Sequence, residues 1–337
     1  MTRVEIVDRA GIPASITNRF WHALGFPVVE DDEVLFTDAD LAALQRVWHL
    51  LGDGVNEETA LAMTRALART TDRLAVWQTQ LIAELFTPAE LTGSSPTASD
   101  VSDGVDPSAN VKDTRTVPNR QIAQSAAREL VRISDELEPL LVFAWRRHLT
   151  AAITRMLADA TPEVPSSAPP RVIGFADLVS FTSLVRRMSE RQLATVVQRF
   201  EALASDIITA HGGRVIKTVG DEVLFVHTDP APAAAIALDL VDAMDEDDLL
   251  PAVRVGMAHG RVVSRLGDVF GITVNRASRL TAVTPSGRVY VDEPLAALLG
   301  NVSGFDVLPT GRRILRGIGA VRPGELRRHS GERRISG

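Results

Sequence analysis

The first half of the chain has apolar residues at helical spacing. Residues 37–52 read TDADLAALQRVWHLLG, in which Thr37 and Asp40 form a capping-box pattern and Gly52 marks a stop. The apolar positions between them recur three and four residues apart, at Leu41, Leu44, Val47, Trp48 and Leu51. This pattern predicts a helix that turns one face to a core.

Two longer segments have the same periodicity. Apolar residues follow a helical pattern over about 57–85, and helix is expected again over about 121–159. Between them, residues 92–119 are rich in Ser, Pro and Asp and too polar to bury a core, which predicts a flexible loop. We therefore expect residues 1–160 to form an all-α domain.

The pattern of apolar and polar residues changes after a short linker. Residues 161–170 contain four prolines, which stop a helix and favour an extended path. Strand-like and helical segments then alternate in the order β-α-β-β-α-β, the order of a ferredoxin-like core, with further elements behind it. Two of the strand-like runs meet at a tight turn over Gly220 and Asp221. The expected fold class is α+β, with helices covering one face of the sheet.

Composition suits a soluble globular protein of two domains. The chain has 337 residues, 45% hydrophobic and 23% charged, and no apolar run approaches the roughly 18 residues that span a bilayer. The first residues, MTRVEIVDRAG, include acidic side chains where a secretory signal needs an apolar core. We expect no membrane span and a cytoplasmic location. The absence of cysteine excludes disulfides, thiolate nucleophiles and Cys-ligated metal sites.

Charge divides the chain. Residues 1–170 contain 15 basic and 24 acidic residues, whereas residues 171–337 contain 21 and 19, so no nucleic-acid partner is expected for the first half. Only Lys112 and Lys217 of the 36 basic residues are lysines. Codon bias explains most of this scarcity, but a lysine kept against that bias can be one whose compact ammonium arginine cannot replace.

Two aspartates lie at corresponding places on neighbouring strands of the expected sheet. Asp177 closes the apolar run RVIGFAD, and Asp221 lies at the tip of the hairpin VIKTVGDEVLF. Each alone is better explained by a local turn. As a pair, both carboxylates project from one edge of the sheet, an arrangement that suits hard divalent cations with a phosphate substrate.

Four motifs in order resemble the catalytic domain of class III nucleotidyl cyclases. They are FADLVSFTSLVRRMS, VIKTVGDEVLFV, VRVGMAHGRVV and GDVFGITVNRASRL, and the resemblance covers residues 171–320. It is closest to soluble mycobacterial-type adenylyl cyclases, which carry an N-terminal regulatory domain. That role falls here to residues 1–160, and residues 321–337 are left as a basic C-terminal tail.

The resemblance implies conversion of ATP to 3′,5′-cyclic AMP and pyrophosphate. Asp177 and Asp221 match the carboxylates that hold two Mg²⁺ or Mn²⁺ ions per site, with the backbone carbonyl of Leu178 as a further ligand. One ion lowers the pKa of the ribose 3′-hydroxyl and the other holds the triphosphate. Arg254 and Arg316 match positions that contact the terminal phosphates.

Two further pairs match residues that contact the nucleoside. Lys217 and Asp268 match the pair that reads adenine, whose ring-nitrogen acceptor and amino donor complement a Lys donor and an Asp acceptor; guanine inverts this pattern. Asn275 and Arg279 match the residues that orient the ribose and stabilise the transition state. They are four residues apart and so share one helix face. Outside the motif they would be interpreted as a local cap and a surface arginine.

The same resemblance implies a homodimer. Lys217 and Asp221 are only four residues apart, yet the family uses them in different active sites, because each site forms between two catalytic domains. Metal ligands then come from one chain, and the adenine and transition-state residues from the other, at two equivalent sites. The short segment RVVSRLG indicates a reduced dimerisation arm.

The N-terminal half has a fainter resemblance of its own. Residues 4–44 are similar to a winged helix-turn-helix of the MerR type, but residues 1–50 hold four arginines against eight acidic residues, the wrong balance for phosphate contacts. A regulatory domain that responds to a small molecule, a lipid or protons is the better interpretation. His22, His49 and His148, each beside a tryptophan, make protonation one hypothesis.

Two other functions remain open at this point. VGDE at 219–222 superficially resembles the GG(D/E)EF hairpin of diguanylate cyclases but lacks its second glycine and its Phe, and a guanylyl cyclase is also possible within the same fold. The other alternative is a non-catalytic transcriptional or nucleotide-sensing module built on the helix-turn-helix-like start. The product formed from ATP or GTP separates these functions.

Overall fold

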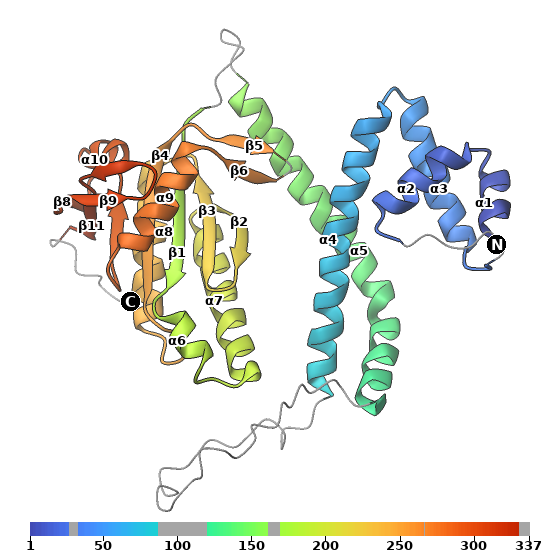
Figure 1. Ribbon diagram of the computed structural model, residues 1–337, viewed down its shortest axis with the longest axis horizontal. Helices are drawn as coiled ribbons and strands as arrows, with labels where there is room; N and C mark the ends of the chain where they lie inside the picture. Colours follow the sequence, from blue (N-terminus) through green and yellow to red (C-terminus); the bar gives the residue numbers. More distant parts are fainter. Residues whose placement is uncertain (27–32, 87–119, 161–168, 266, 330–337) are drawn as a thin grey trace, which may run out of the picture. The chain divides into compact units, whose positions relative to one another are not determined.

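The computed structural model describes residues 1–26, 33–86, 120–160, 169–265 and 267–329 (Figure 1). It divides into two compact units, Met1–Ile153 and Thr154–Gly337. The division falls inside a helix rather than in the predicted linker. The flexible loop expected over 92–119 and most of that linker lie outside the described residues.

The first unit is helical. Its helices are α1 (Arg3–Ala10), α2 (Ala14–Ala23), α3 (Asp38–Gly52), α4 (Glu57–Leu85) and α5 (Arg120–Asp159), the last of which continues into the second unit. The predicted helices are confirmed to within a residue, and so is the capping box, in which Thr37 N donates to Asp40 Oδ2 at 2.8 Å. A small core that includes Ile6, Phe20, Leu44 and Leu61 joins the first four helices. No helix in the described ranges has the length and apolar character needed to cross a bilayer.

The second unit contains a seven-stranded sheet in the order β2-β3-β1-β4-β7-β11-β8. Its strands are β1 (Arg171–Leu178), β2 (Arg214–Val219), β3 (Glu222–His227), β4 (Val253–Gly260), β7 (Val289–Val291), β8 (Phe305–Pro309) and β11 (Gly324–Arg328). Two small hairpins add β5 (Val263–Arg265) with β6 (Asp268–Phe270), and β9 (Arg313–Leu315) with β10 (Gly319–Val321). The strands β2-β3-β1-β4 pair antiparallel in the order predicted for a ferredoxin-like core.

Helices cover both faces of this sheet, so the expected single covered face was wrong. On one face, Val172 and Leu178 of β1 pack with α7 (Glu190–Ala210), α8 (Pro230–Asp245) and α10 (Glu293–Leu299). On the other face, Ile173 and Phe175 pack with Ala277 of α9 (Ile272–Val283). Many of the residues through which α9 contacts the sheet are small. The sequence therefore has no stripe of long apolar side chains there that would predict a helix on the second face. The short α6 (Phe181–Val185) follows β1.

The prediction of a basic tail from residue 321 was also wrong for the residues up to 328. Residues 324–328 form β11, which pairs with β7 on one side and β8 on the other. Gly324 and Leu326 are buried in this strand, while Arg327 is exposed. Only two residues of GELRR face the core, too few for the alternation to be recognised. Residues 330–337 lie outside the described part.

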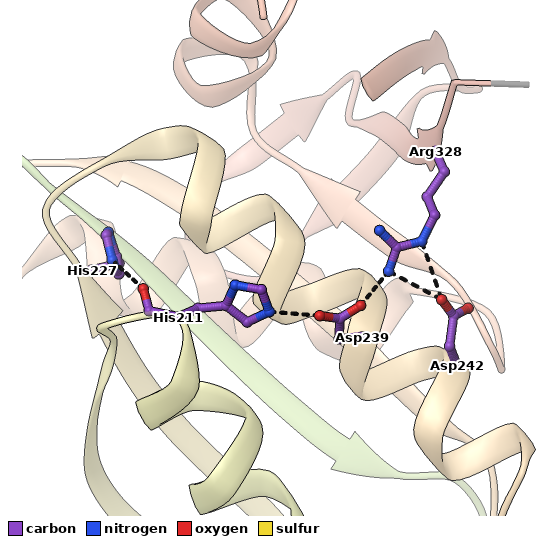
Figure 2. Close-up of polar contacts among 5 residues, drawn as sticks. All are labelled: His211, His227, Asp239, Asp242 and Arg328. Carbon is purple, nitrogen blue, oxygen red and sulfur yellow. Dashed lines mark hydrogen bonds and ion pairs between the residues drawn. The ribbon is translucent and has the colours of Figure 1, made fainter. Parts of the chain in front are cut away.

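A polar network joins α7, α8 and β11 on the face opposite to α9 (Figure 2). His211 Nε2 lies 2.5 Å from Asp239 Oδ2, and Arg328 pairs with both Asp239 and Asp242. Asp229 N donates to His227 Nδ1 at 2.8 Å, which leaves His227 Nε2 to donate to His211 O at 3.1 Å. The network lies at the far end of β3 from the hairpin tip, so we assign it to the stability of the unit.

Candidate active site

Strand register brings three charged side chains together on the α9 face of the sheet. Asp177 of β1 lies opposite Glu222 of β3 and, on its other side, opposite Arg254 of β4. Directly opposite residues of antiparallel strands point to the same face. Asp221 precedes Glu222 at the tip of the β2–β3 turn, where Gly220 adopts a left-handed φ of 62° and Leu178 N donates to Asp221 O at 3.0 Å. The structure therefore places Asp177 and Asp221 at the same end of the neighbouring strands β1 and β3.

Arg254 contacts the first of these carboxylates directly. Its Nε and Nη2 donate to Asp177 Oδ2 at 2.8 and 2.6 Å, and its Nη1 donates to the carbonyl of Ala282 in α9 at 3.3 Å. Both bonds to Asp177 end on the same oxygen, and no described residue donates to the other one, Oδ1. The arginine matched to the terminal phosphates thus lies beside the aspartate matched to the metals.

In the described part of the chain, three carboxylates, of Asp177, Asp221 and Glu222, lie near only two cationic side chains, Arg254 and Lys217. Burial raises the pKa of Asp221, and the charge of Asp177 raises it further. Burial raises the pKa of Glu222 to about 7, with Asp177 and Asp221 adding to the effect, while Arg254 and Lys217 oppose it. A cation placed here would relieve this repulsion.

Replacing Glu222 by Gln is expected to stabilise the protein at alkaline pH in metal-free buffer. The pKa of this carboxyl is about 7 in the folded chain against 4.5 in the unfolded chain. Its ionisation therefore costs stability progressively between those values, and the whole cost is present above pH 7. For this half-buried group we expect a Tm gain of roughly 2–6 °C at pH 8.5 after allowing for solvent screening. A neutral Gln gains little at pH 4.5. Thermal unfolding at both pH values measures the difference; an equal gain at both would contradict the shifted pKa.

The donor set at this edge fits a hard divalent cation. Asp177 and Asp221 supply two carboxylates. Leu178, the last residue of β1 and the neighbour of Asp177, supplies a backbone carbonyl. Among the described residues no group of three or more His, Asp or Glu side chains suits a metal. Mg²⁺ commonly binds through one or two carboxylates, with substrate phosphates and water completing its shell. The residues present therefore suit an ion that arrives with a phosphorylated substrate.

Lys217 and Asp268 form a second charged pair. Lys217 Nζ lies 2.7 Å from Asp268 Oδ2, although 51 residues separate them. A register shift between Val215 and Lys217 marks a bulge in β2, a feature that re-aims the side chain that follows it. The hydrogen bond from Lys217 is the main cause that lowers the pKa of Asp268. A donor and an acceptor are therefore fixed side by side at the start of β6. Lys112, the other lysine, lies outside the described residues.

Asn275 and Arg279 are both exposed on α9, one turn apart. Within the described residues neither side chain has a hydrogen-bond partner, so both are free to contact a ligand. Arg316 is exposed in the turn between β9 and β10, where no described residue pairs with it. The structure thus shows no contact between Arg316 and the carboxylates, unlike Arg254.

Two groups at this site were missed by the sequence analysis. Glu222 shares a strand face with Leu224 and Val226, so two-residue alternation from the neighbouring Asp221 could have located it. The ion pair of Arg276 with Asp292, 2.9 Å apart, joins α9 to the residue before α10. No local pattern in the sequence indicates that pair.

Comparison with known proteins supports a catalytic function. A family described as "Adenylate and Guanylate cyclase catalytic domain" matches residues 167–328. An adenylate cyclase of Glutamicibacter nicotianae is 37% identical, with 96% of this chain and 78% of the relative covered. An adenylate cyclase of Streptomyces coelicolor is 35% identical over 98% of this chain and 86% of the relative. The chain belongs to the class III adenylyl cyclases.

A third relative of this cyclase is a pH-sensitive adenylate cyclase of Mycobacterium tuberculosis. It is 32% identical, with 96% of this chain and 77% of the relative covered, so the similarity includes the helical half. Family membership makes the chain an enzyme of cyclic nucleotide synthesis. It removes the non-catalytic module as an interpretation of the whole chain.

Proposed function

We propose that this cyclase converts ATP to 3′,5′-cyclic AMP and pyrophosphate at two equivalent sites of a homodimer in the cytoplasm. The observation that carries the proposal is the pairing of Lys217 with Asp268. An ammonium donor beside a carboxylate acceptor complements the ring nitrogen and the amino group of adenine, whereas guanine presents the opposite pattern. The pair is accessible, with 43% of the Lys217 side chain exposed.

The reaction forms a bond from the ribose 3′-oxygen to the α-phosphorus and breaks the bond from that phosphorus to pyrophosphate. Asp177, Asp221 and the Leu178 carbonyl would hold two Mg²⁺ or Mn²⁺ ions. When bound, such ions lower the pKa of the 3′-hydroxyl and neutralise the triphosphate.

The remaining groups position the substrate and stabilise charge. Asn275 orients the ribose, and Arg279 stabilises the charge that develops on the α-phosphate. Arg254 lies beside Asp177 and contacts the terminal phosphates, and Arg316 reaches them from its exposed turn. The proton of the 3′-hydroxyl leaves to water.

Exposed apolar side chains support a second copy across this site. Val219 lies at the end of β2, Val263 and Phe270 lie on the β5–β6 hairpin, and Ile272 starts α9, all of them exposed. Val219 shares β2 with Lys217, and Phe270 shares β6 with Asp268, so a partner that covers these apolar side chains would also cover the charged pair. In that dimer, one chain supplies the metal ligands and the other supplies Lys217, Asp268, Asn275 and Arg279.

The helical half belongs to the same proposal as a regulatory domain. Its similarity to the pH-sensitive mycobacterial cyclase favours a proton over a lipid or another small molecule as its effector. His22, His49 and His148 lie in this half, and all three are exposed.

Product identification tests the proposal. The purified full chain, given Mn²⁺ or Mg²⁺ with ATP, is expected to form cyclic AMP and pyrophosphate, and chelation of the metal should stop the reaction. GTP should be turned over much more slowly. The Asp177→Asn variant is the control and should be inactive. Cyclic GMP or a cyclic dinucleotide as the main product would replace this function with one of its alternatives.

A further inference from the structure

α9 is anchored at one side by a buried carboxylate. Arg276 directly follows Asn275, and its Nη1 donates to Asp292 Oδ2 at 2.9 Å. Only 5% of the Asp292 side chain is exposed. Its other oxygen, Oδ1, accepts from the backbone N–H groups of His259 and Leu295, each at 3.1 Å. Both oxygens of this buried carboxylate are therefore bonded.

These bonds fix the position of Asp292. It follows β7, it is the N-cap of α10, and it holds the end of β4 through His259. Two strands of the sheet, β4 and β7, and the helix α10 therefore define where the carboxylate lies. Arg276, which donates to the Oδ2 oxygen of Asp292, is therefore held by a rigid part of the fold.

The other contacts of α9 set its distance from the sheet. A Cβ added to Gly256 of β4 would lie 2.2 Å from Thr281 N, and one added to Gly260 would lie 2.7 Å from Thr273 Oγ1. The backbones approach closely because these positions lack side chains. Hydrogen bonds also tie α9 to the rest of the unit: Thr273 Oγ1 donates to Arg261 O at 2.8 Å, and Arg254 Nη1 donates to Ala282 O at 3.3 Å. Arg276 adds an ion pair to these contacts, one residue from Asn275.

We propose that Arg276 is a positioning residue whose pair with Asp292 sets the rotation of α9. This inference rests on the proposed function, because the helix carries Asn275 and Arg279. At 3.6 residues per turn, Asn275 and Arg279 differ in direction by about 40°, and Arg276 lies about 60° beyond Arg279 on the neighbouring face of the helix. A rotation of roughly 20° moves the tip of a helical side chain by about 2 Å, and a misplacement of about 1 Å can cost 100-fold in rate.

Kinetics of three single variants test the proposal. Arg276→Met should lower kcat by about 10- to 100-fold while KM for ATP stays within about twofold, because Arg276 does not touch the substrate. Arg276→Lys should restore most of kcat, since an ammonium can still bond to Asp292. Arg288→Met is the matched control. It breaks the Arg288–Glu325 pair, which is 2.8 Å long and includes no residue of α9, and it should leave kcat unchanged.

Hydrogen exchange separates this inference from the cyclase assignment. Amides of residues 272–283 should exchange faster in Arg276→Met than in the wild type or in Arg288→Met, whether or not the wild type makes cyclic AMP. Unchanged exchange in α9, or an unchanged kcat, would overturn the positioning role. A raised KM with normal kcat would overturn it too, because it would make Arg276 a substrate contact.

Discussion

A one-to-one mixture of Asp221→Ala and Lys217→Ala chains is expected to recover about a quarter of wild-type activity. Alone, Asp221→Ala should lose about 1,000-fold, because the metal site loses one of its two carboxylates. Lys217→Ala alone should lose about 100-fold, because Asp268 and the adenine both lose their donor. No other change to this chain should reveal the assembly of the site so directly.

The recovery follows from the proposed sharing of residues between chains. Random pairing makes about half of the dimers heterodimers. In each heterodimer one site combines the intact Asp221 of one chain with the intact Lys217 of the other, and the second site carries both lesions. One working site in four is the result. The chains must be coexpressed or refolded together, and cyclic AMP formation is then measured at equal total protein.

The matched control combines two lesions on the same side of the site. Asp177→Ala mixed with Asp221→Ala should stay inactive, because each shared site would take both metal carboxylates from a single chain. Recovery in this control, or its absence in the first mixture, would contradict the composite site. Size-exclusion chromatography of every mixture confirms that dimers formed.

Sequence reasoning located the parts of the site that depend on local patterns. The tight turn at Gly220 and Asp221 follows from two strand-like runs around a glycine, and the order β2-β3-β1-β4 follows from the alternation of elements. Together these place Asp177 beside Glu222 and Arg254, so the carboxylate edge could be predicted.

The remaining features depend on contacts without a local signature. α9 covers the second face through small residues such as Ala277 and Thr281, whose pattern along the sequence is not that of an amphipathic helix. β11 has only Gly324 and Leu326 to show that it is a strand. The pair of Arg276 with Asp292 is set by how α9 and α10 meet the sheet, which no spacing rule specifies.

Lys217→Arg is expected to lower kcat/KM for ATP by about 10- to 100-fold and the ATP:GTP preference at least about tenfold. The ammonium of Lys217 reaches Asp268 from a bulged strand, 2.7 Å away. A guanidinium keeps the charge but is longer and planar, so it can pair with both carboxylate oxygens and occupy the acceptor needed for the adenine amino group.

The matched control exchanges the same two residue types in the opposite direction, in an ion pair outside the site. Arg327→Lys alters an exposed residue of β11 that pairs with Glu325 at 2.8 Å, and it should leave both quantities unchanged. Because the Lys217 side chain is 43% exposed, Lys217→Arg should also unfold at the wild-type temperature, which excludes misfolding as the cause of its defect. Initial rates with ATP and GTP give both ratios. Wild-type kinetics and selectivity in Lys217→Arg would show that any cation suffices at this position, and adenine recognition would then have to lie elsewhere in the site.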